Sequence, residues 1–157
     1  MKVDQICICM IAILLVGCTS APETPDGGGV LPKCGALPNC VNSQTGIGRS
    51  AIAPLQATAG QWQELKQWLG KQDNWTIQVE AADFLQAVVK TPLMQFRDDV
   101  QLLYNPNTGL IQVRSSSRLG ISDMGTNRRR VESLRAHIVD GPAVSGLDLL
   151  QIQPKSR

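Results

Sequence analysis

Residues 110–130, with the sequence LIQVRSSSRLGISDMGTNRRR, concentrate side chains that are suited to binding anions. The segment contains five arginines and four serines but a single acid, Asp123. Guanidinium groups hold carboxylates and phosphates through paired hydrogen bonds, and serine hydroxyls supply further donors. Asp98 and Asp99 precede the segment and offer the same arginines internal partners. The residues therefore suit two kinds of chemistry, the binding of an external anion and the formation of internal ion pairs.

The first arginines of this segment belong to a predicted β-strand. Residues 110–118 alternate with a period of two, which places Arg114, Ser116 and Arg118 on one face. The preceding NPNTG sequence predicts a hairpin, so the two aspartates of the previous strand should lie beside the end of this one. We therefore expect Arg114 or Arg118 to form a bidentate ion pair with one of these aspartates.

The later arginines belong to a predicted helix that begins near Asn127. Ser122 and Asp123 precede this start, and asparagine is a favoured helix-capping residue. The free amides and partial positive charge of a helix N-terminus attract anions, and Arg128 adds a full charge beside them. The strand-to-helix junction is thus a candidate anion site or ion-pair cluster. Its predicted members are Asp98, Asp99, Arg114, Ser116, Arg118, Ser122, Asp123, Asn127 and Arg128.

Two other interpretations of the junction are open. In one, the ion pairs and serines only fix the turn, and the arginines form a solvated helix face. In the other, Asp98, Asp99 and Asp123 supply the acid and base groups of a hydrolase. The serines have no plausible base, because His137 is the only histidine and lies late in the helix. Without a recognised catalytic or metal-binding motif, we assign no catalytic residue, cofactor or metal ion.

The pattern of apolar residues predicts two helices and a sheet. A capping-box sequence at 58–61 is followed by Trp62, Leu65 and Leu69 at helical spacing, and a second helix follows the junction. The strands between them are joined by short turns and must be antiparallel. The predicted fold is therefore α+β, a four-stranded antiparallel β-meander flanked by two amphipathic helices on one face. The strands are expected at residues 75–80, 84–89, 94–104 and 110–118.

The N-terminal residues predict export and a lipid anchor. Lys2 precedes an apolar run at 6–16, which is too short to span a bilayer and is typical of a signal peptide. The run ends in Leu-Val-Gly-Cys, which resembles the bacterial lipobox, so residues 1–17 should be removed and Cys18 lipidated. Threonine rather than aspartate after this cysteine favours the outer membrane, facing the periplasm. The membrane is thus an expected partner through the lipid on Cys18.

The rest of the chain divides into a linker and one domain. Residues 18–32 are rich in proline, glycine and threonine and predict a flexible linker, whereas 33–157 predict a single α+β domain. Cys34 and Cys40 remain in the mature chain, and a disulfide between them is expected in an oxidising compartment. A redox pair or half of a metal site are the alternatives, although the spacing is not Cys-x-x-Cys and no second Cys/His pair completes a tetrahedral site.

The net charge argues against one class of partner. At +2 over 157 residues it is too small to indicate nucleic-acid binding. The positive charge is local instead, because six of the nine arginines fall within residues 114–135. An anionic partner should therefore be sought at the junction.

Several motifs resemble those of the bacterial family called domain of unknown function 1499. They are PNCV at 38–41 with Ser43, FRDDV at 96–100, and the run 111–118, which continues into SDMG and NRRR. The resemblance covers about residues 34–138 and implies one domain built around this junction. Many members of that family are exported or lipid-anchored, but the resemblance implies no activity. Asn42 departs from the serine expected after the PNCV motif.

Together these features predict a lipid-anchored protein of the bacterial cell envelope. We expect a binding or interaction module for an anionic envelope component or an envelope protein. The first alternative is a purely structural or assembly lipoprotein, and the second is a hydrolase that uses Asp98, Asp99 and Asp123.

Lipidation of Cys18 is directly testable in cells. The Cys18→Ser variant should lose incorporation of labelled palmitate, because the thiol that carries the lipid is absent. Metabolic labelling followed by electrophoresis measures this, with Cys34→Ser as a control that keeps the label. Labelling that persists in the Cys18→Ser variant would contradict the assignment.

Overall fold

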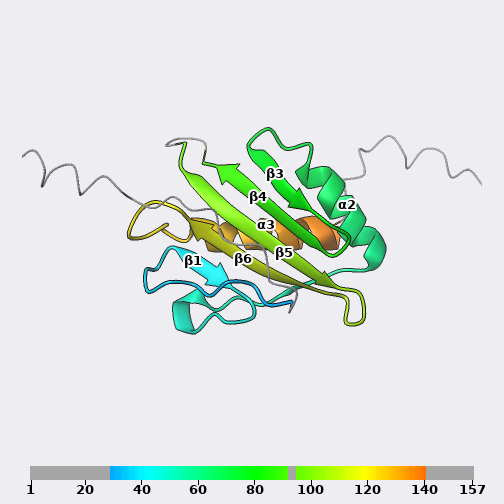
Figure 1. Ribbon diagram of the computed structural model, residues 1–157, viewed down its shortest axis with the longest axis horizontal. Helices are drawn as coiled ribbons and strands as arrows, with labels where there is room; N and C mark the ends of the chain where they lie inside the picture. Colours follow the sequence, from blue (N-terminus) through cyan, green and yellow to red (C-terminus); the bar gives the residue numbers. More distant parts are fainter. Residues whose placement is uncertain (1–28, 92–94, 141–157) are drawn as a thin grey trace, which may run out of the picture.

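The computed structural model describes residues 29–91 and 95–140, so the predicted signal peptide, Cys18 and most of the linker lie outside the described residues. Figure 1 shows a sheet with two helices against it. In chain order the elements are β1 (Cys40–Asn42), η1 (Gly48–Ser50), β2 (Leu55–Gln56), α2 (Ala59–Leu69), β3 (Trp75–Glu80), β4 (Phe84–Lys90), β5 (Arg97–Asn105), β6 (Leu110–Ser117) and α3 (Thr126–Asp140). None of the described helices is long and apolar enough to cross a membrane.

The sheet has six strands, and every pairing between them is antiparallel. Its order is β1-β6-β5-β4-β3, and β2 pairs with β6 as well. The α+β class and the meander from β3 to β6 are confirmed, but the expectation of only four strands is wrong. β1 and β2 have three and two residues, too few to show an alternating pattern. They exist because β6 offers its second edge to the backbone of the lead-in, as in the pair Cys40↔Ser116.

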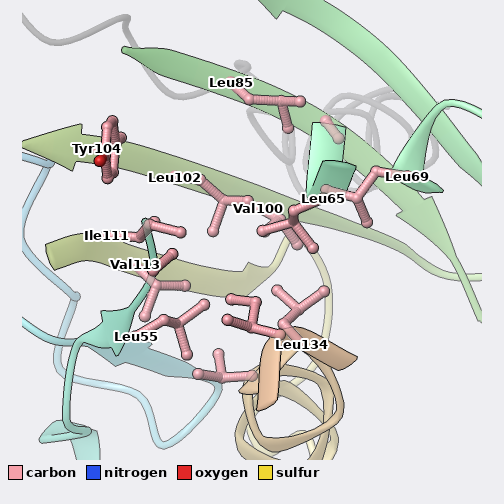
Figure 2. Packing of buried hydrophobic residues seen from close by; sticks show 14 of the residues in the cluster. Leu55, Leu65, Leu69, Leu85, Val100, Leu102, Tyr104, Ile111, Val113 and Leu134 are labelled. Carbon is pink, nitrogen blue, oxygen red and sulfur yellow. The ribbon is translucent and has the colours of Figure 1, made fainter. Parts of the chain in front are cut away.

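Both helices pack on the same face of the sheet. Alternation along the central strands directs Leu85, Val100 and Val113 towards the helices, where they meet Leu65 of α2 and Leu134 of α3. Figure 2 shows these side chains converging in one core between the sheet and the helices. The strand interiors and the apolar faces of the helices are therefore buried together, as the two-residue and helical periods predicted.

Helix α2 begins as its sequence predicts. The Thr58 hydroxyl accepts a hydrogen bond from the Gln61 amide, and the Gln61 side chain accepts one from the Thr58 amide. Trp62 stacks on Tyr104 at 5.7 Å between ring centroids, and its indole nitrogen donates to the Ala82 carbonyl. The apolar stripe of α2 thus serves the core.

The lead-in before α2 runs along the β6 edge of the sheet, where β1 and β2 pair with that strand. A disulfide joins Cys34 to Cys40, as expected. The Asn42 side chain accepts hydrogen bonds from the amides of Gln44 and Thr45 and donates one to the Pro32 carbonyl. Asn42 is fully buried, so this residue, which departs from the family motif, organises the turn after β1.

Candidate functional site

The two adjacent aspartates of β5 lie on opposite faces of the sheet. Alternation places Asp98 on the face covered by the helices and Asp99 on the other, and both are nearly fully buried. The β5–β6 register sets Asp98 opposite Ser117 and Asp99 opposite Ser116. Each carboxylate therefore needs its own cationic partner.

Asp99 pairs with Arg118 just beyond the end of β6. The guanidinium Nε and Nη2 donate to the two carboxylate oxygens at 2.9 and 2.8 Å, the bidentate arrangement expected from the hairpin. This hydrogen bonding raises the pKa of Arg118 above its usual value, against a smaller opposing effect of burial. The predicted pairing of Arg118 with an aspartate is confirmed.

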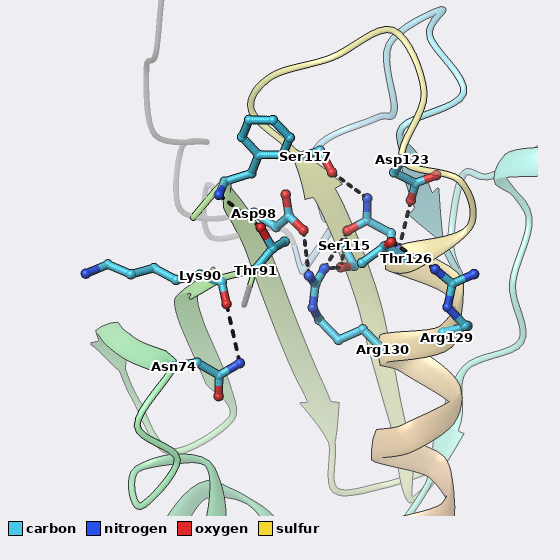
Figure 3. Close-up of polar contacts among 12 residues, drawn as sticks. Asn74, Lys90, Thr91, Asp98, Ser115, Ser117, Asp123, Thr126, Arg129 and Arg130 are labelled. Carbon is cyan, nitrogen blue, oxygen red and sulfur yellow. Dashed lines mark hydrogen bonds and ion pairs between the residues drawn. The ribbon is translucent and has the colours of Figure 1, made fainter. Parts of the chain in front are cut away.

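Asp98 pairs with Arg130 of α3, within a buried network (Figure 3). Arg130 Nη2 donates to Asp98 Oδ2 at 2.5 Å, while Nη1 donates to Ser115 Oγ and to Asn127 Oδ1. The Asn127 amide donates in turn to Ser117 Oγ and to the Asn39 carbonyl. Asn127 thus joins α3 to β6, and Arg130 joins it to both β5 and β6, so the network fixes the helix on the sheet.

The N-terminus of α3 is occupied by a carboxylate of the same chain. Asp123 accepts hydrogen bonds from the amides of Gly125 and Asn127 at 2.9 and 2.8 Å. Burial raises the pKa of Asp123, but hydrogen bonds from Asn127 and Gly125 together lower it below the usual value. Asn127 does not cap the helix as expected, because Asp123 already holds its amide and its side chain turns to the sheet. An external anion would have to displace Asp123.

The outward arginines of α3 bind backbone carbonyls. Arg128 donates to the carbonyls of Arg49 and Ala51, at 2.9 and 2.6 Å. Arg135 donates to the carbonyls of residues 53 and 54 at 2.9 and 2.8 Å. Arg129 binds the Met124 carbonyl and the Thr126 hydroxyl. These side chains hold the segment between β1 and β2, and the loop before α3, against the helix.

Arg114 is the exception among the junction arginines. It lies on the same face as Asp99, but its Nε and Nη1 are buried without a hydrogen-bond partner. Burial lowers its pKa, and the charge of Asp99 offsets only part of that effect. The expected pair with an aspartate forms at Arg118 and not at Arg114.

The nine predicted site residues do not form one cluster. Ser116 lies on the Asp99 face, and Ser122 accepts a hydrogen bond from the Met124 amide in the loop before α3. Of the proposed acid and base groups, Asp99 lies on the opposite face of the sheet from Asp98, whereas Asp123 is joined to the Asp98 network through Asn127. Within the described residues, no group of three or more His, Cys, Asp or Glu side chains could hold a metal ion.

A cleft of about 810 Å³ opens beside the Asp98 network. It lies between the end of α2, the start of β3, the end of β4, the start of β5, the loop after β6 and the first turns of α3. Figure 3 shows Asp98 with one carboxylate oxygen facing Arg130 and the other turned away from it. That second oxygen, Oδ1, is buried and has no hydrogen-bond partner. The apolar lining includes Trp75, Val89, Phe96, Leu119, Met124 and Leu134, and the polar lining includes Lys90, Asp98, Ser117, Arg129, Arg130 and Ser133.

A smaller cleft of about 440 Å³ lies on the other side of the loop before α3. Ser122, Asp123 and Arg128 line it together with Arg49, so it contains three of the predicted anion-binding residues. Asp123 already accepts hydrogen bonds from the helix amides, and Arg128 already donates to carbonyls. This cleft therefore offers an anion fewer hydrogen-bond donors than the sequence suggested.

Sequence reasoning missed Arg130 as a site residue, as well as the apolar wall of the larger cleft. One available signal was helical spacing, since Asn127 and Arg130 are three residues apart and share a helix face. The other was strand alternation, which places Asp98 on the helix-covered face. No comparable signal exists for the cleft, because its wall comes from six separate segments.

The comparisons with known proteins agree with this domain. The model of the family described as Protein of unknown function (DUF1499) matches residues 30–138. The chain belongs to this family. The matched span contains every described strand and nearly all of α3, so the junction and both clefts are part of the DUF1499 domain. Searches of the curated proteins and of the solved structures find no match.

The contrast between Arg114 and Arg118 can be measured as stability. Arg114→Met should leave the free energy of unfolding unchanged or raise it, because a buried guanidinium with two unpaired donors is replaced by an apolar chain of similar length. Arg118→Met should lower it by about 3 kcal/mol, because Asp99 becomes a buried carboxylate without a partner. Urea denaturation of both variants measures the difference. Equal losses would show that Arg114 has a stabilising partner.

Asp123 predicts a specific pH dependence. Its pKa is depressed in the folded state, so its contribution to stability is present above about pH 4 and is lost as the pH falls through the folded value. Asp123→Ala should therefore cost about 1 kcal/mol at pH 7, as the loss of a helix cap does. The difference from the wild type should shrink towards pH 3. Urea titrations across this range test it, and a constant difference would contradict it.

Proposed function

We propose that this DUF1499 protein is a lipid-anchored module of the bacterial cell envelope that binds an amphipathic envelope component in the larger cleft. The observation that carries the proposal is the unpartnered Oδ1 of Asp98 in a cleft with apolar walls. A buried acceptor without a donor costs about 1–3 kcal/mol, and a ligand hydroxyl or amino group recovers that cost. The lipobox-like sequence before Cys18 supports the anchor and the compartment.

The walls and rim of the cleft specify the rest of the ligand. Trp75, Phe96 and Leu134 offer apolar surface for a hydrocarbon or ring system. Lys90 and Arg129 lie at the edge and suit an anionic group. The expected ligand thus has an apolar body, a hydrogen-bond donor directed at Asp98 and a negative charge near the rim. This retains the anionic envelope component predicted from the sequence but places its site in the cleft.

The arginines of the junction that already have partners within the chain argue against the junction itself as the anion site. Arg118 and Arg130 are neutralised by aspartates, and Arg128 is bonded to carbonyls. A phosphate at the α3 N-terminus would compete with the covalently tethered carboxylate of Asp123. A hydrolase is a weaker proposal, because Asp99 is not among the residues that line the cleft, Asp98 is paired with Arg130, and Asp123 is held by the amides of Gly125 and Asn127.

Binding in the cleft can be tested with the fluorescent amine N-phenylnaphthylamine, which has an apolar body and one N–H donor. The probe should bind the mature chain, from residue 18 onward with Cys18→Ser, and gain fluorescence. Ser133→Trp should weaken binding at least tenfold, because Ser133 lines the cleft and is exposed, so a large side chain fills the cleft without disturbing the core. Ala136→Trp is the matched control, since Ala136 is exposed on the same helix but is not among the lining residues.

Competition identifies the head group. Lysophosphatidylglycerol, which is anionic and carries hydroxyls, should displace the probe at lower concentration than zwitterionic lysophosphatidylcholine, both below their micelle concentrations. If the Ser133→Trp chain binds the probe as well as the Ala136→Trp chain does, the cleft is not a ligand site. The structural or assembly lipoprotein would then be the better description.

A further inference from the structure

Large apolar side chains are exposed at one end of the domain. The described residues include eight exposed large hydrophobic side chains, and five of them lie at this end, which we call the apolar end. Ile121 and Met124 are 76% and 87% exposed, so they face water almost completely. Met124 also has a left-handed φ of 50°, a conformation that is unfavourable for a side chain of this size. The apolar end comprises Leu37, Phe96, Leu119, Ile121 and Met124.

Backbone contacts bring these residues together from three segments. The Asn39 side chain donates to the Gly120 carbonyl at 2.9 Å, which joins the disulfide loop to the loop after β6. The Arg118 amide donates to the Arg97 carbonyl at 3.2 Å, which joins that loop to the start of β5. The three segments meet at the left of Figure 1, opposite the β5–β6 hairpin. The apolar end is therefore a continuous feature of the fold and not a scatter of single residues.

The charges around the apolar end leave a small positive excess. Lys90, Arg97 and Arg129 are exposed there. The nearby aspartates of β5 are buried in ion pairs. Asp73 is exposed beside Asn74, whose side chain donates to the Lys90 carbonyl, and the half-buried carboxylate of Asp123 lies in the same loop as Ile121 and Met124. These two acids offset two of the three cations. Exposed apolar side chains with a cationic rim suit the interface of an anionic bilayer.

We propose that the apolar end docks on an anionic lipid surface, with Ile121 and Met124 inserted among the acyl chains. This inference rests on the envelope placement in the proposed function. The larger cleft opens at the same end, because Phe96, Leu119 and Met124 line it as well. A docked domain would therefore receive an amphipathic ligand directly from the bilayer, without passage through water.

The expected anchor permits this orientation. Gly29 lies near Leu103, towards the hairpin end of the sheet, so the chain must cross the length of the domain before the apolar end meets the membrane. Ten residues lie between Cys18 and Gly29, so the chain between these two positions can extend by at most about 40 Å. The nine residues of β5 span about 30 Å. The linker is therefore long enough for the apolar end to reach the bilayer that holds the anchor.

Tryptophan quenching by brominated lipids tests the docking. Ile121 and Val139 are both 76% exposed, but Val139 lies near the C-terminal end of α3, about 20 Å along the helix from its start. The Ile121→Trp and Val139→Trp variants of the lipoprotein, purified from cells, are reconstituted in vesicles of phosphatidylglycerol and phosphatidylcholine brominated on the acyl chains. Ile121→Trp should lose at least half of its added fluorescence, whereas Val139→Trp should lose little.

Salt and lipid composition provide the controls. High salt, or vesicles of phosphatidylcholine alone, should weaken the quenching of Ile121→Trp, because the cationic rim no longer attracts the surface. Equal quenching of the two variants, or none of Ile121→Trp, overturns the proposal and leaves the apolar end to a protein partner. Ile121 is not among the residues that line the cleft. The probe-binding assay in solution therefore fails or succeeds independently of this one.

Discussion

The adjacent pair Asp98-Asp99 constrains the rest of the structure. Neighbouring residues of a strand must face opposite sides, so two buried carboxylates in sequence demand cations on both faces of the sheet. Arg118, just beyond the end of β6, pairs with Asp99, and Arg130 of α3 pairs with Asp98. A slip of one residue between β5 and β6 would exchange the faces and leave both charges unpaired. Strand register and helix placement are thus specified by the same two residues.

This arrangement changes the meaning of the arginine-rich junction. The number of arginines in this segment suggests anion binding. In the structure, however, most of these guanidinium groups bind carboxylates or carbonyls of the same chain. The group that a ligand could bind is the second carboxylate oxygen of Asp98. Asp98 also holds α3 on the sheet, but its Oδ1 has no hydrogen-bond partner. The stabilising network and the proposed ligand site therefore share a residue, which couples recognition to the position of the helix.

The sequence predicted those features that depend on neighbouring residues. The start of α2 follows from the reciprocal bonds of Thr58 and Gln61, and the Arg118–Asp99 pair follows from a hairpin and strand alternation. β1 and β2 were missed because their pairing with β6 is a long-range backbone contact that no local pattern encodes. Arg130 was missed for a related reason, since its partner Asp98 is 32 residues away and only the docked helix brings them together.

Arg128 and Arg135 bind the segment between β1 and β2 through its backbone carbonyls. The two sides of this contact therefore depend on side-chain identity to different degrees. Any amino acid presents a carbonyl, so residues 49–54 can change their side chains without losing their half of these contacts. Arg135 is specified more tightly, because its two terminal nitrogens donate to the carbonyls of residues 53 and 54, and lysine has no planar fork that could bridge them. This segment, whose η1 turn borders the smaller cleft, can thus acquire new surface chemistry while the domain beneath it keeps its shape.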